Sequence, residues 1–311
     1  MAGIGLGCWA LGSDSYGFVS EKDAESLIKS SIEMGITFFD TAPIYGDGLS
    51  ELRLGKYLPN NTDLKVATKV GITSDRGGII KKNLTSDIII KSIDNSLKRL
   101  NRNSIYMLQL HSPELGFEND ELLICLDNLK RSGKVQKIGI SLKSPMDFEK
   151  QVRVFPWDGV QFNCSMIDQR IRKFSDDLRI LRKRGVDLIA RTPLNFGFLS
   201  QSPPIINELT AYHHLKNWPS EQLTHWLELR EEALSIVSAF GFSILQSALR
   251  FPIDSNLATI VIPGAQNVEQ LLQNIQAFQQ ALPYELLTLI ESKLSRTSKV
   301  HSPYQILNET N

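Results

Sequence analysis

The chain has 311 residues, of which 42% are hydrophobic and 22% charged, enough for one large core or two smaller ones. Its 34 basic residues balance 34 acidic residues, so neither a basic stripe for nucleic acid nor an acidic tail for a cationic partner is indicated. The three cysteines, Cys8, Cys125 and Cys164, are widely spaced, which argues against a disulfide framework and against a zinc site.

The N-terminal stretch is apolar but lacks the positively charged leader of a signal peptide. No apolar run approaches the roughly 20 residues that span a bilayer. We therefore expect a soluble, cytoplasmic protein with neither a membrane nor a nucleic acid as its partner; the sequence does not predict its oligomeric state.

Short apolar segments rich in β-formers recur along the chain and predict strands. The segments are 4–10, 36–40, 65–70, 105–110, 135–141, 158–163, 186–190 and 257–263. Several stretches between them have helical spacing. The first, residues 20–35, opens with Ser20 as an N-cap and closes with Gly35 as a C-cap signal. Further helices are predicted over 85–100 with Thr85 as cap, 119–133, 176–185, 267–281 and 283–296.

Strands without clean alternation, separated by helices, indicate a buried parallel sheet. Eight such units close most naturally into a (β/α)8 TIM barrel, here a single domain over residues 1–311. The rival is an open doubly wound sheet, which would need GxGxxG after its first strand. The glycines at positions 3, 5 and 7 lack a third glycine in register. A long irregular stretch, 194–221, follows the seventh strand on the side where barrel enzymes carry their sites.

Polar residues at strand ends are the candidates for chemistry in such a barrel. They are Asp40 and, in the following loop, Tyr45; then Lys69, His111, Ser141, Gln161, Asn163, Arg191 and Thr192. A phenol is a poor acid at neutral pH, and a nearby ammonium such as that of Lys69 lowers its pKa. Asp40 can pair with Lys69, and His111 can donate a hydrogen bond to a carbonyl oxygen. This set can protonate a developing alkoxide, and the missing hydride implies a nicotinamide cofactor.

Each of these residues also has an ordinary structural interpretation. An Asp at a strand end is usually a helix cap, a loop Tyr usually packs, and a lone His is more often structural than functional. The functional interpretation depends on four compatible groups that all lie at or just past the ends of consecutive strands.

At these motifs the chain resembles the aldo-keto reductase superfamily, in its bacterial type, over nearly its whole length. The segment FFDTAPIYGDGLSELRLGKYL resembles the family's signature, and GLGCW, ATKV, LQLHSP, GIS, VQFN and IPGAQNVEQLLQN follow in the expected order. The resemblance implies that Tyr45 is the proton donor, that Lys69 lowers its pKa with support from Asp40, and that His111 orients the substrate carbonyl. It also implies that Trp9 lines the substrate pocket.

The resemblance further implies a site for NADP(H) or NAD(H) and no metal. Ser141 and Gln161 would hold the nicotinamide carboxamide. The other implied cofactor residues are Gly7, Cys8, Trp9, Asp40, Arg191, Thr192, Pro193, Leu194, Phe196, Gly197, Ile262, Gly264, Ala265, Gln266, Gln270 and Asn274. The stretches RTPLNFGFLSQ and HHLKNWPSEQLTHW resemble a subgroup often met among sugar and secondary-metabolite reductases.

The chain departs from the family pattern at three places. Leu142 stands where an Asn is common, and Arg191 stands where an aromatic residue commonly stacks on the nicotinamide. A guanidinium can also stack, but its charge would favour the reduced cofactor over the oxidised form. Gly264 and Gln270 replace the basic residues that commonly bind a 2′-phosphate, which weakens the case for NADP; Arg296 and Lys299 are the alternative cations.

Other residues have two interpretations each. His213, His214 and His225 are poorly spaced for a metal site and fit a solvated loop or the substrate mouth. Trp218 and Trp226 fit either a lid over sugar rings or ordinary packing.

We therefore expect an NAD(P)(H)-dependent oxidoreductase that transfers hydride between nicotinamide and a small-molecule carbonyl or alcohol, on a sugar-like or polar substrate. The alternative is a cofactor-binding regulatory or scaffold protein with little turnover, against which the intact set of four residues argues. A lyase or isomerase that uses Tyr45 and Lys69 for proton abstraction is a third option, against which Ser141 and Gln161 argue.

Overall fold

The structure, a computed structural model, describes residues 3–12, 17–61, 63–74, 80–209 and 213–295. Eight parallel strands form one sheet, and their order along the chain is their order in space. The strands are β1 (Leu6–Gly7), β2 (Phe38–Asp40), β3 (Lys65–Val70), β6 (Ile105–His111), β7 (Val135–Ser141), β8 (Gly159–Asn163), β9 (Asp187–Arg191) and β10 (Ile260–Val261).

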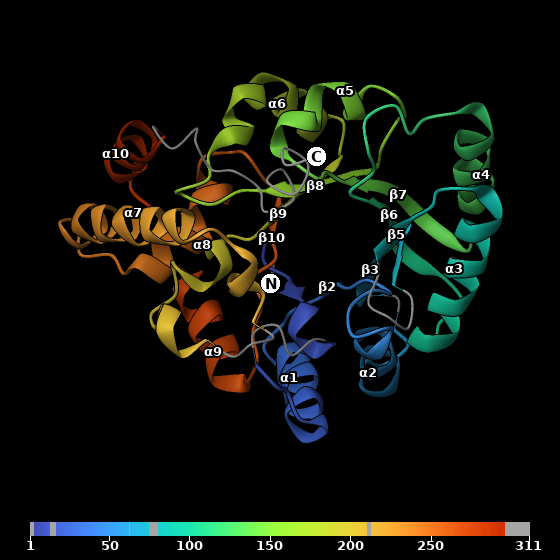
Figure 1. The fold of residues 1–311 in the computed structure, drawn as a ribbon, viewed down its shortest axis with the longest axis horizontal. Helices are drawn as coiled ribbons and strands as arrows, with labels where there is room; N and C mark the ends of the chain where they lie inside the picture. Colours follow the sequence, from blue (N-terminus) through green and yellow to red (C-terminus); the bar gives the residue numbers. More distant parts are fainter. Residues whose placement is uncertain (1–2, 13–16, 62, 75–79, 210–212, 296–311) are drawn as a thin grey trace.

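The sheet closes on itself between its first and last strands. Gly5 N donates to Val261 O at 2.9 Å, Gly7 N donates to Pro263 O at 2.9 Å, and Gly7 lies in register with Gly264. The helices surround the strands (Figure 1). The predicted (β/α)8 barrel is therefore confirmed, and the open doubly wound sheet is excluded.

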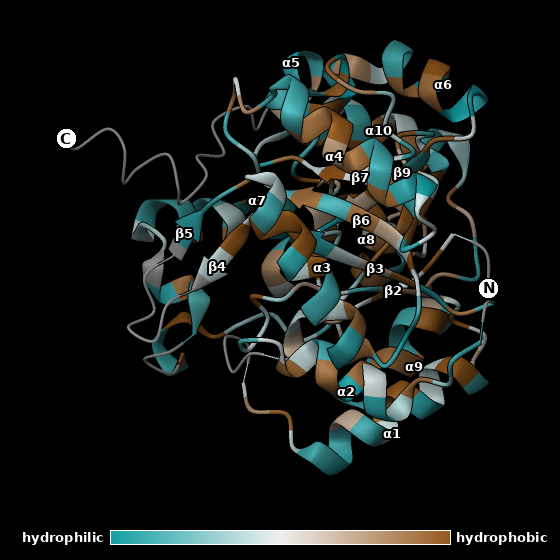
Figure 2. Ribbon diagram, turned by 90° about the vertical axis from the view of Figure 1, so that its right-hand side faces the viewer, coloured by the Kyte–Doolittle hydropathy of each residue, from teal (hydrophilic) through white to brown (hydrophobic). Residues whose placement is uncertain are grey.

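The helices bury one face against the barrel and expose the other, so that hydrophilic and hydrophobic residues mix along each helix (Figure 2). They are α1 (Glu21–Glu33), α2 (Leu49–Tyr57), α3 (Ser86–Leu100), α4 (Asp120–Arg131), α5 (Phe148–Val152), α6 (Ser175–Lys183), α7 (Ser220–Ser238), α8 (Ile244–Asp254), α9 (Val268–Ala277) and α10 (Tyr284–Leu294). None of the helices in the described ranges is long and apolar enough to cross a bilayer.

The ends of the elements match the predictions unevenly. Ser20 caps α1 as predicted, since its side chain accepts from Asp23 N. Thr85 occupies the N-cap position of α3 but makes no side-chain cap bond. The first predicted strand is wrong beyond Gly7, because Trp9–Leu11 turn into a 3-10 helix, η1. The hairpin of β4 (Ile72–Ser74) and β5 (Ile80–Lys82), which follows β3, was not predicted.

The stretch between β9 and α7 contains three short 3-10 helices: η4 (Asn195–Gly197), η5 (Ile206–Glu208) and η6 (His214–Asn217). Two more such helices, η2 (Pro145–Asp147) and η3 (Arg170–Phe174), precede α5 and α6. Arg230 of α7 holds the start of the long stretch, donating to Phe198 O at 2.5 Å and to Ser200 O at 2.9 Å. Trp226 of the same helix is fully buried beneath it. This stretch is therefore anchored to the barrel wall.

The core has two compartments. A large cluster fills the space between the sheet and the helices. A smaller one lies inside the barrel and contains Phe38, Ala67, Met107, Ile189 and Ile262. Polar side chains above this inner cluster, toward the carboxyl ends of the strands, build the candidate site.

Candidate active site

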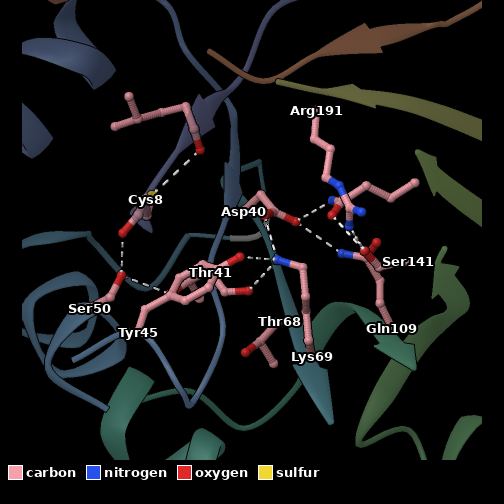
Figure 3. A network of polar contacts seen from close by, with 12 residues as sticks. Cys8, Asp40, Thr41, Tyr45, Ser50, Thr68, Lys69, Gln109, Ser141 and Arg191 are labelled. Carbon is pink, nitrogen blue, oxygen red and sulfur yellow. Dashed lines mark hydrogen bonds and ion pairs between the residues drawn. The ribbon is translucent and has the colours of Figure 1, made fainter. Parts of the chain in front are cut away.

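One end of the barrel gathers polar side chains from six strands. Asp40, His111, Ser141 and Arg191 are the last residues of β2, β6, β7 and β9. Lys69 is the penultimate residue of β3, and Gln161 is the middle residue of β8. The register places His111, Ser141 and Gln161 in one row across β6, β7 and β8. Figure 3 shows Asp40, Tyr45, Lys69, Ser141 and Arg191 as one connected polar network.

Lys69 is the centre of this network. Its ammonium nitrogen lies 2.6 Å from Asp40 Oδ2, 2.9 Å from Thr41 O and 3.1 Å from the Tyr45 hydroxyl. Both members of the Asp40–Lys69 pair are buried. Burial by itself lowers the pKa of Lys69, but Asp40 and Tyr45 outweigh it and raise the pKa above its ordinary value. The ammonium is therefore charged at neutral pH.

Tyr45 accepts the hydrogen bond from Lys69, so its own proton is directed elsewhere. Its pKa differs from the expectation. Burial raises it above its ordinary value, Lys69 lowers it, and the carboxylate of Asp40 raises it further, so that the net direction is upward. The sequence predicted the effect of the lysine correctly but could not weigh the desolvation that opposes it. The phenol is thus protonated at neutral pH, as a proton donor must be.

Close backbone contacts position the loop that carries Tyr45. Gly46 has φ +63°, and a Cβ there would lie 1.6 Å from Gly12 O. A Cβ on Gly12 would lie 2.1 Å from Tyr45 O. Ser50 Oγ donates to Cys8 O at 2.8 Å, and Thr41 Oγ1 is 2.8 Å from Ser50 Oγ. Two glycines and two hydroxyls therefore fasten this loop to the turn after β1.

His111 lies edge-on to Tyr45, with ring centroids 6.3 Å apart. Desolvation lowers the pKa of this histidine well below its ordinary value, and the positive charges of Lys69, Arg191 and Lys82 add to the effect. The imidazole is therefore neutral at physiological pH. In that state it can donate one hydrogen bond to an oxygen without carrying charge.

Further aromatic rings lie near the phenol. Trp9 stacks near Tyr45 at 6.1 Å, and His214 of the long loop lies 5.4 Å from Trp9. Phe196 contacts His214 at 5.2 Å and Trp226 at 5.5 Å. The histidines of this loop were interpreted either as part of a solvated loop or as residues of the substrate mouth. His214 fits the second interpretation. Trp218 and Trp226 are buried packing residues.

Ser141 and Gln161 bond to each other and to charged partners. Ser141 Oγ donates to Gln161 Oε1 at 2.9 Å, and Gln161 Nε2 donates to Asp40 Oδ1 at 2.7 Å. Arg191 Nη1 donates to Ser141 Oγ at 2.7 Å, and Nη2 donates to Leu142 O at 2.7 Å. After these bonds, one lone pair of the serine hydroxyl and one N–H of the glutamine amide remain unused. Together they can accept one hydrogen bond from a carboxamide and donate one to it.

Arg191 joins the ends of three strands. Besides the bonds to Ser141 and Leu142, its Nε donates to Asn163 Oδ1. Leu142 itself turns its side chain into the core, so its carbonyl oxygen is what meets the guanidinium. The turn that follows holds three non-glycine residues at positive φ: Thr192 at 55°, Asn195 at 44° and Phe196 at 58°. Such backbone strain clusters at functional sites.

The remaining residues implied for the cofactor lie around the start of α9. Gln266 N donates to Gln270 Oε1 at 2.9 Å, and Asn274 Nδ2 donates to Gly264 O at 3.2 Å. A Cβ on Gly264 would meet only Gly7 O, at 3.8 Å, so this bend is open.

The other residues implied for the cofactor offer few side-chain groups. Ile262 and Ala265 are buried and could offer only backbone groups, as could Cys8. Pro193 is also buried, whereas Leu194 and Gly197 are half-buried in the turn after Arg191. Arg296 and Lys299 lie outside the described residues.

No group of three or more His, Cys, Asp or Glu side chains is placed to hold a metal ion in the ranges that the structure describes. Cys8 and Cys164 are buried, and burial raises the pKa of both thiols. Cys125 is a core residue of α4. These thiols are neutral and therefore poor nucleophiles.

Three residues of the site, Thr41, Ser50 and Gln109, were not predicted from the sequence. Thr41 and Ser50 have no signal of their own, because their role depends on a turn after β1 that was predicted as strand. Gln109 precedes His111 by two residues on β6, so strand periodicity alone places both on the same face of the sheet. A polar residue on the inward face of a barrel strand was therefore a signal available in the sequence.

Comparisons with known proteins agree with this geometry. The model of the aldo/keto reductase family matches residues 3–295. The chain is 28% identical over 277 residues to an oxidoreductase of Bacillus subtilis described as uncharacterized, covering 88% of this chain and 86% of that one. It is 29% identical over 318 residues to L-galactose dehydrogenase of Arabidopsis thaliana, covering 99% and 92%.

Among solved structures, the holo form of aldo-keto reductase AKR11C1 from Bacillus halodurans matches with a TM-score of 0.78 and 25% identity, over 95% of this chain and 92% of that one. Fold and comparisons together define an oxidoreductase on a TIM barrel. The chain belongs to the aldo/keto reductase family, whose members in general depend on NAD(P)H.

Proposed function

We propose that this protein reduces the carbonyl group of a small, polar substrate at the expense of a nicotinamide dinucleotide, with Tyr45 as the proton donor. The observation that carries the proposal is the 3.1 Å contact between Lys69 Nζ and the Tyr45 hydroxyl, backed by the 2.6 Å pair with Asp40. The four side chains that such a reaction needs come from β2, its following loop, β3 and β6, and meet at one end of the barrel.

The chain's own groups account for the proton. His111, neutral and edge-on to Tyr45, donates a hydrogen bond to the substrate carbonyl oxygen and orients it. Tyr45 gives its proton to that oxygen as negative charge develops there, and Lys69 stabilises the phenolate that remains. A nicotinamide dinucleotide, when bound by Ser141 and Gln161, would supply the hydride for the carbonyl carbon. The phenolate then regains a proton from solvent, so the products are an alcohol and the oxidised dinucleotide.

The donor groups of the site fit a dinucleotide. Ser141 and Gln161 retain capacity for one carboxamide after their bonds to each other, Arg191 and Asp40 are counted. The open bend at Gly264 lies before the N-terminus of α9, where barrels commonly bind phosphate. Residues 264–274 contain no Lys or Arg, and Glu269 lies in the first turn of α9. We therefore propose that NADH is preferred over NADPH, because a 2′-phosphate would face neutral amides and a carboxylate.

The mouth of the site supports a hydroxylated substrate. Trp9 stacks near Tyr45 and His214 lies against Trp9, so the wall beside the phenol is aromatic, and imidazole and indole each carry a polar edge. A sugar presents an apolar face and a hydroxylated rim, which suits such a wall. The relative named L-galactose dehydrogenase points in the same direction. We propose an aldose, a ketose or a related polyol as the substrate class.

The test is to follow the absorbance of NADH and NADPH with a panel of aldehydes, aldoses and ketoses, beside a Tyr45→Phe variant. We expect turnover with at least one sugar-like carbonyl, and its loss in the variant by a factor of about 10² or more. Cofactor affinity, measured by fluorescence titration, should be unchanged in the variant. Tight cofactor binding without turnover on any carbonyl would instead support a regulatory or scaffold role.

A further inference from the structure

A buried glutamine lies one layer below the proton-donor cluster, on the inward face of β6. Met107, Gln109 and His111 alternate along this strand, and Gln109 is in register with Lys69 of β3. The side chain of Gln109 has none of its surface exposed. Its Nε2 donates a hydrogen bond of 3.0 Å to Asp40 Oδ1 (Figure 3).

Asp40 is thereby held by donors from three different strands. Its Oδ1 accepts from Gln109 of β6 and from Gln161 of β8, and its Oδ2 accepts from Lys69 of β3. The carboxylate cannot rotate without breaking at least one of these bonds. Because Lys69 also contacts Tyr45, the orientation of the carboxylate is passed on to the phenol.

Gln109 lowers stability in one respect. Its Oε1 is buried and has no hydrogen-bond partner in the described part of the chain, which is unfavourable inside a protein. Gly139 of β7 leaves the space that the side chain uses, since a Cβ there would lie 3.3 Å from Gln109 Cγ. A leucine or methionine would fill this layer without an unpaired oxygen. The amide is thus better explained by what its N–H groups do than by packing.

We propose that Gln109 is a positioning residue for proton delivery: it fixes the carboxylate of Asp40, which holds Lys69 against Tyr45. This inference rests on the proposed function, because it concerns the proton that Tyr45 donates. Gln161 makes a similar bond to Asp40 but lies in the row of His111 and Ser141, and with Ser141 it is proposed to hold the carboxamide. Gln109 lies below that row, so its loss is expected to act on turnover and not on cofactor affinity.

The first test is Gln109→Leu, which keeps the volume and removes the amide. We expect kcat to fall by about tenfold, the change that corresponds to roughly one charge-assisted hydrogen bond. The Kd for NADH should not change, and Tm should not fall, since the unpaired oxygen is removed as well. Met107→Leu is the matched control, because it alters the same inward face of β6 without touching Asp40, and its kcat should equal that of the wild type.

The second test is Gln109→Glu, which keeps the shape of the side chain. When protonated, the introduced carboxyl can donate to Asp40; when ionised, it repels Asp40. We therefore expect kcat of this variant to rise as pH falls, toward the wild-type value, and the wild type to show no such rise. The charged and titratable groups that face this cluster are Asp40, Lys69, Tyr45, His111, Arg191 and Cys8, and all of them are shared by the two proteins.

Two results would overturn the inference. One is wild-type kcat in both Gln109 variants. The other is a loss of kcat that follows equal losses in Tm and NADH affinity without recovery in acid, which would mark a purely structural residue. Tyr45→Phe separates this failure from that of the proposed function: if it retains turnover, Tyr45 is not the proton donor, whatever Gln109 does.

Discussion

Lys69 holds Tyr45 from one side while Asp40 holds Lys69 from the other, at 3.1 Å and 2.6 Å. This arrangement explains why the buried phenol can still give up its proton. Desolvation raises the pKa of Tyr45, and the lysine is the strongest group that opposes it. The ammonium therefore matters most after the proton has left, when it faces a buried phenolate that water cannot stabilise.

Replacing Lys69 should consequently affect both rate and stability. In Lys69→Met the phenolate loses its counterion, and we expect kcat to fall by about 10² or more. Asp40 remains as a buried charge without its partner, so the free energy of unfolding should fall by about 3–5 kcal/mol. Turnover and urea denaturation measure the two effects. Lys143→Met is the control, because it removes a lysine paired with Glu114 near a strand end. An equal loss in both variants would contradict this role.

The pH profile of the reaction follows from two pKa directions. The pKa of Tyr45 is raised, so the donor stays protonated throughout the neutral range, and the rate of reduction should fall only above about pH 10. The pKa of His111 is lowered well below 6.5, so the imidazole gains charge only in acid. We expect kcat/KM for reduction to be flat between about pH 6 and 9. An inflection near pH 6.5 that disappears in a His111→Gln variant would show that the histidine titrates where we expect it to be neutral.

The close approach of the Gly12 and Gly46 backbones fixes the position of the loop that carries Tyr45. In Gly46→Ala the new methyl would meet Gly12 O, and the residue would also be strained at φ +63°. We expect turnover to drop by about tenfold or more, since small displacements of reacting groups are costly. Gly116→Ala is the matched control: Gly116 has φ +77°, but nothing lies within 4 Å of its Cβ position. If both variants lose the same activity, backbone strain explains the effect and the contact does not.

The sequence predicted the barrel because eight strand-like segments alternate with helical ones, and the family motifs fall at their ends. The position of each polar residue at the end of its predicted strand was enough to place four of them correctly at the carboxyl ends of strands: Asp40, Lys69, His111 and Ser141. The sequence could not predict that the turn after β1 packs backbone against backbone on the Tyr45 loop, because that contact is long-range. It also could not predict the upward pKa of Tyr45, since burial is a property of the whole fold.

For the long loop, too, the sequence predicted some features and could not predict others. Its length and position were clear from the sequence, whereas the contact of His214 with Trp9 needed the path of the chain over the barrel. The sequence places Arg191 where an aromatic residue commonly stacks on the nicotinamide, and a guanidinium can stack there too. The structure holds it by hydrogen bonds to Ser141, Asn163 and Leu142, which no spacing rule could indicate.

The proposed preference for NADH can be tested at the start of α9. Gln270→Arg places a guanidinium in the first turn of α9, the helix that follows the open bend at Gly264 and that we propose to face the 2′-phosphate. We expect the Kd for NADPH to fall by about tenfold, because a charge-assisted bond to phosphate is gained, and the Kd for NADH to change little. Gln273→Arg, on the same helix, controls for the added charge. Equal effects of both variants on NADPH would indicate only long-range attraction.

The charge of Arg191 should bias the site toward the reduced dinucleotide. An oxidised nicotinamide ring carries positive charge, which a guanidinium at the ends of β7, β8 and β9 would repel. In Arg191→Tyr we expect the ratio of the Kd for NAD+ to the Kd for NADH to fall by about fivefold, corresponding to roughly 1 kcal/mol. Asn163→Ala is the matched control, because it removes a hydrogen-bond partner of Arg191 but not its charge. A ratio that moves in Asn163→Ala as much as in Arg191→Tyr would mean that the arginine acts by holding strand ends together, and that its charge has no part in choosing the redox state of the cofactor.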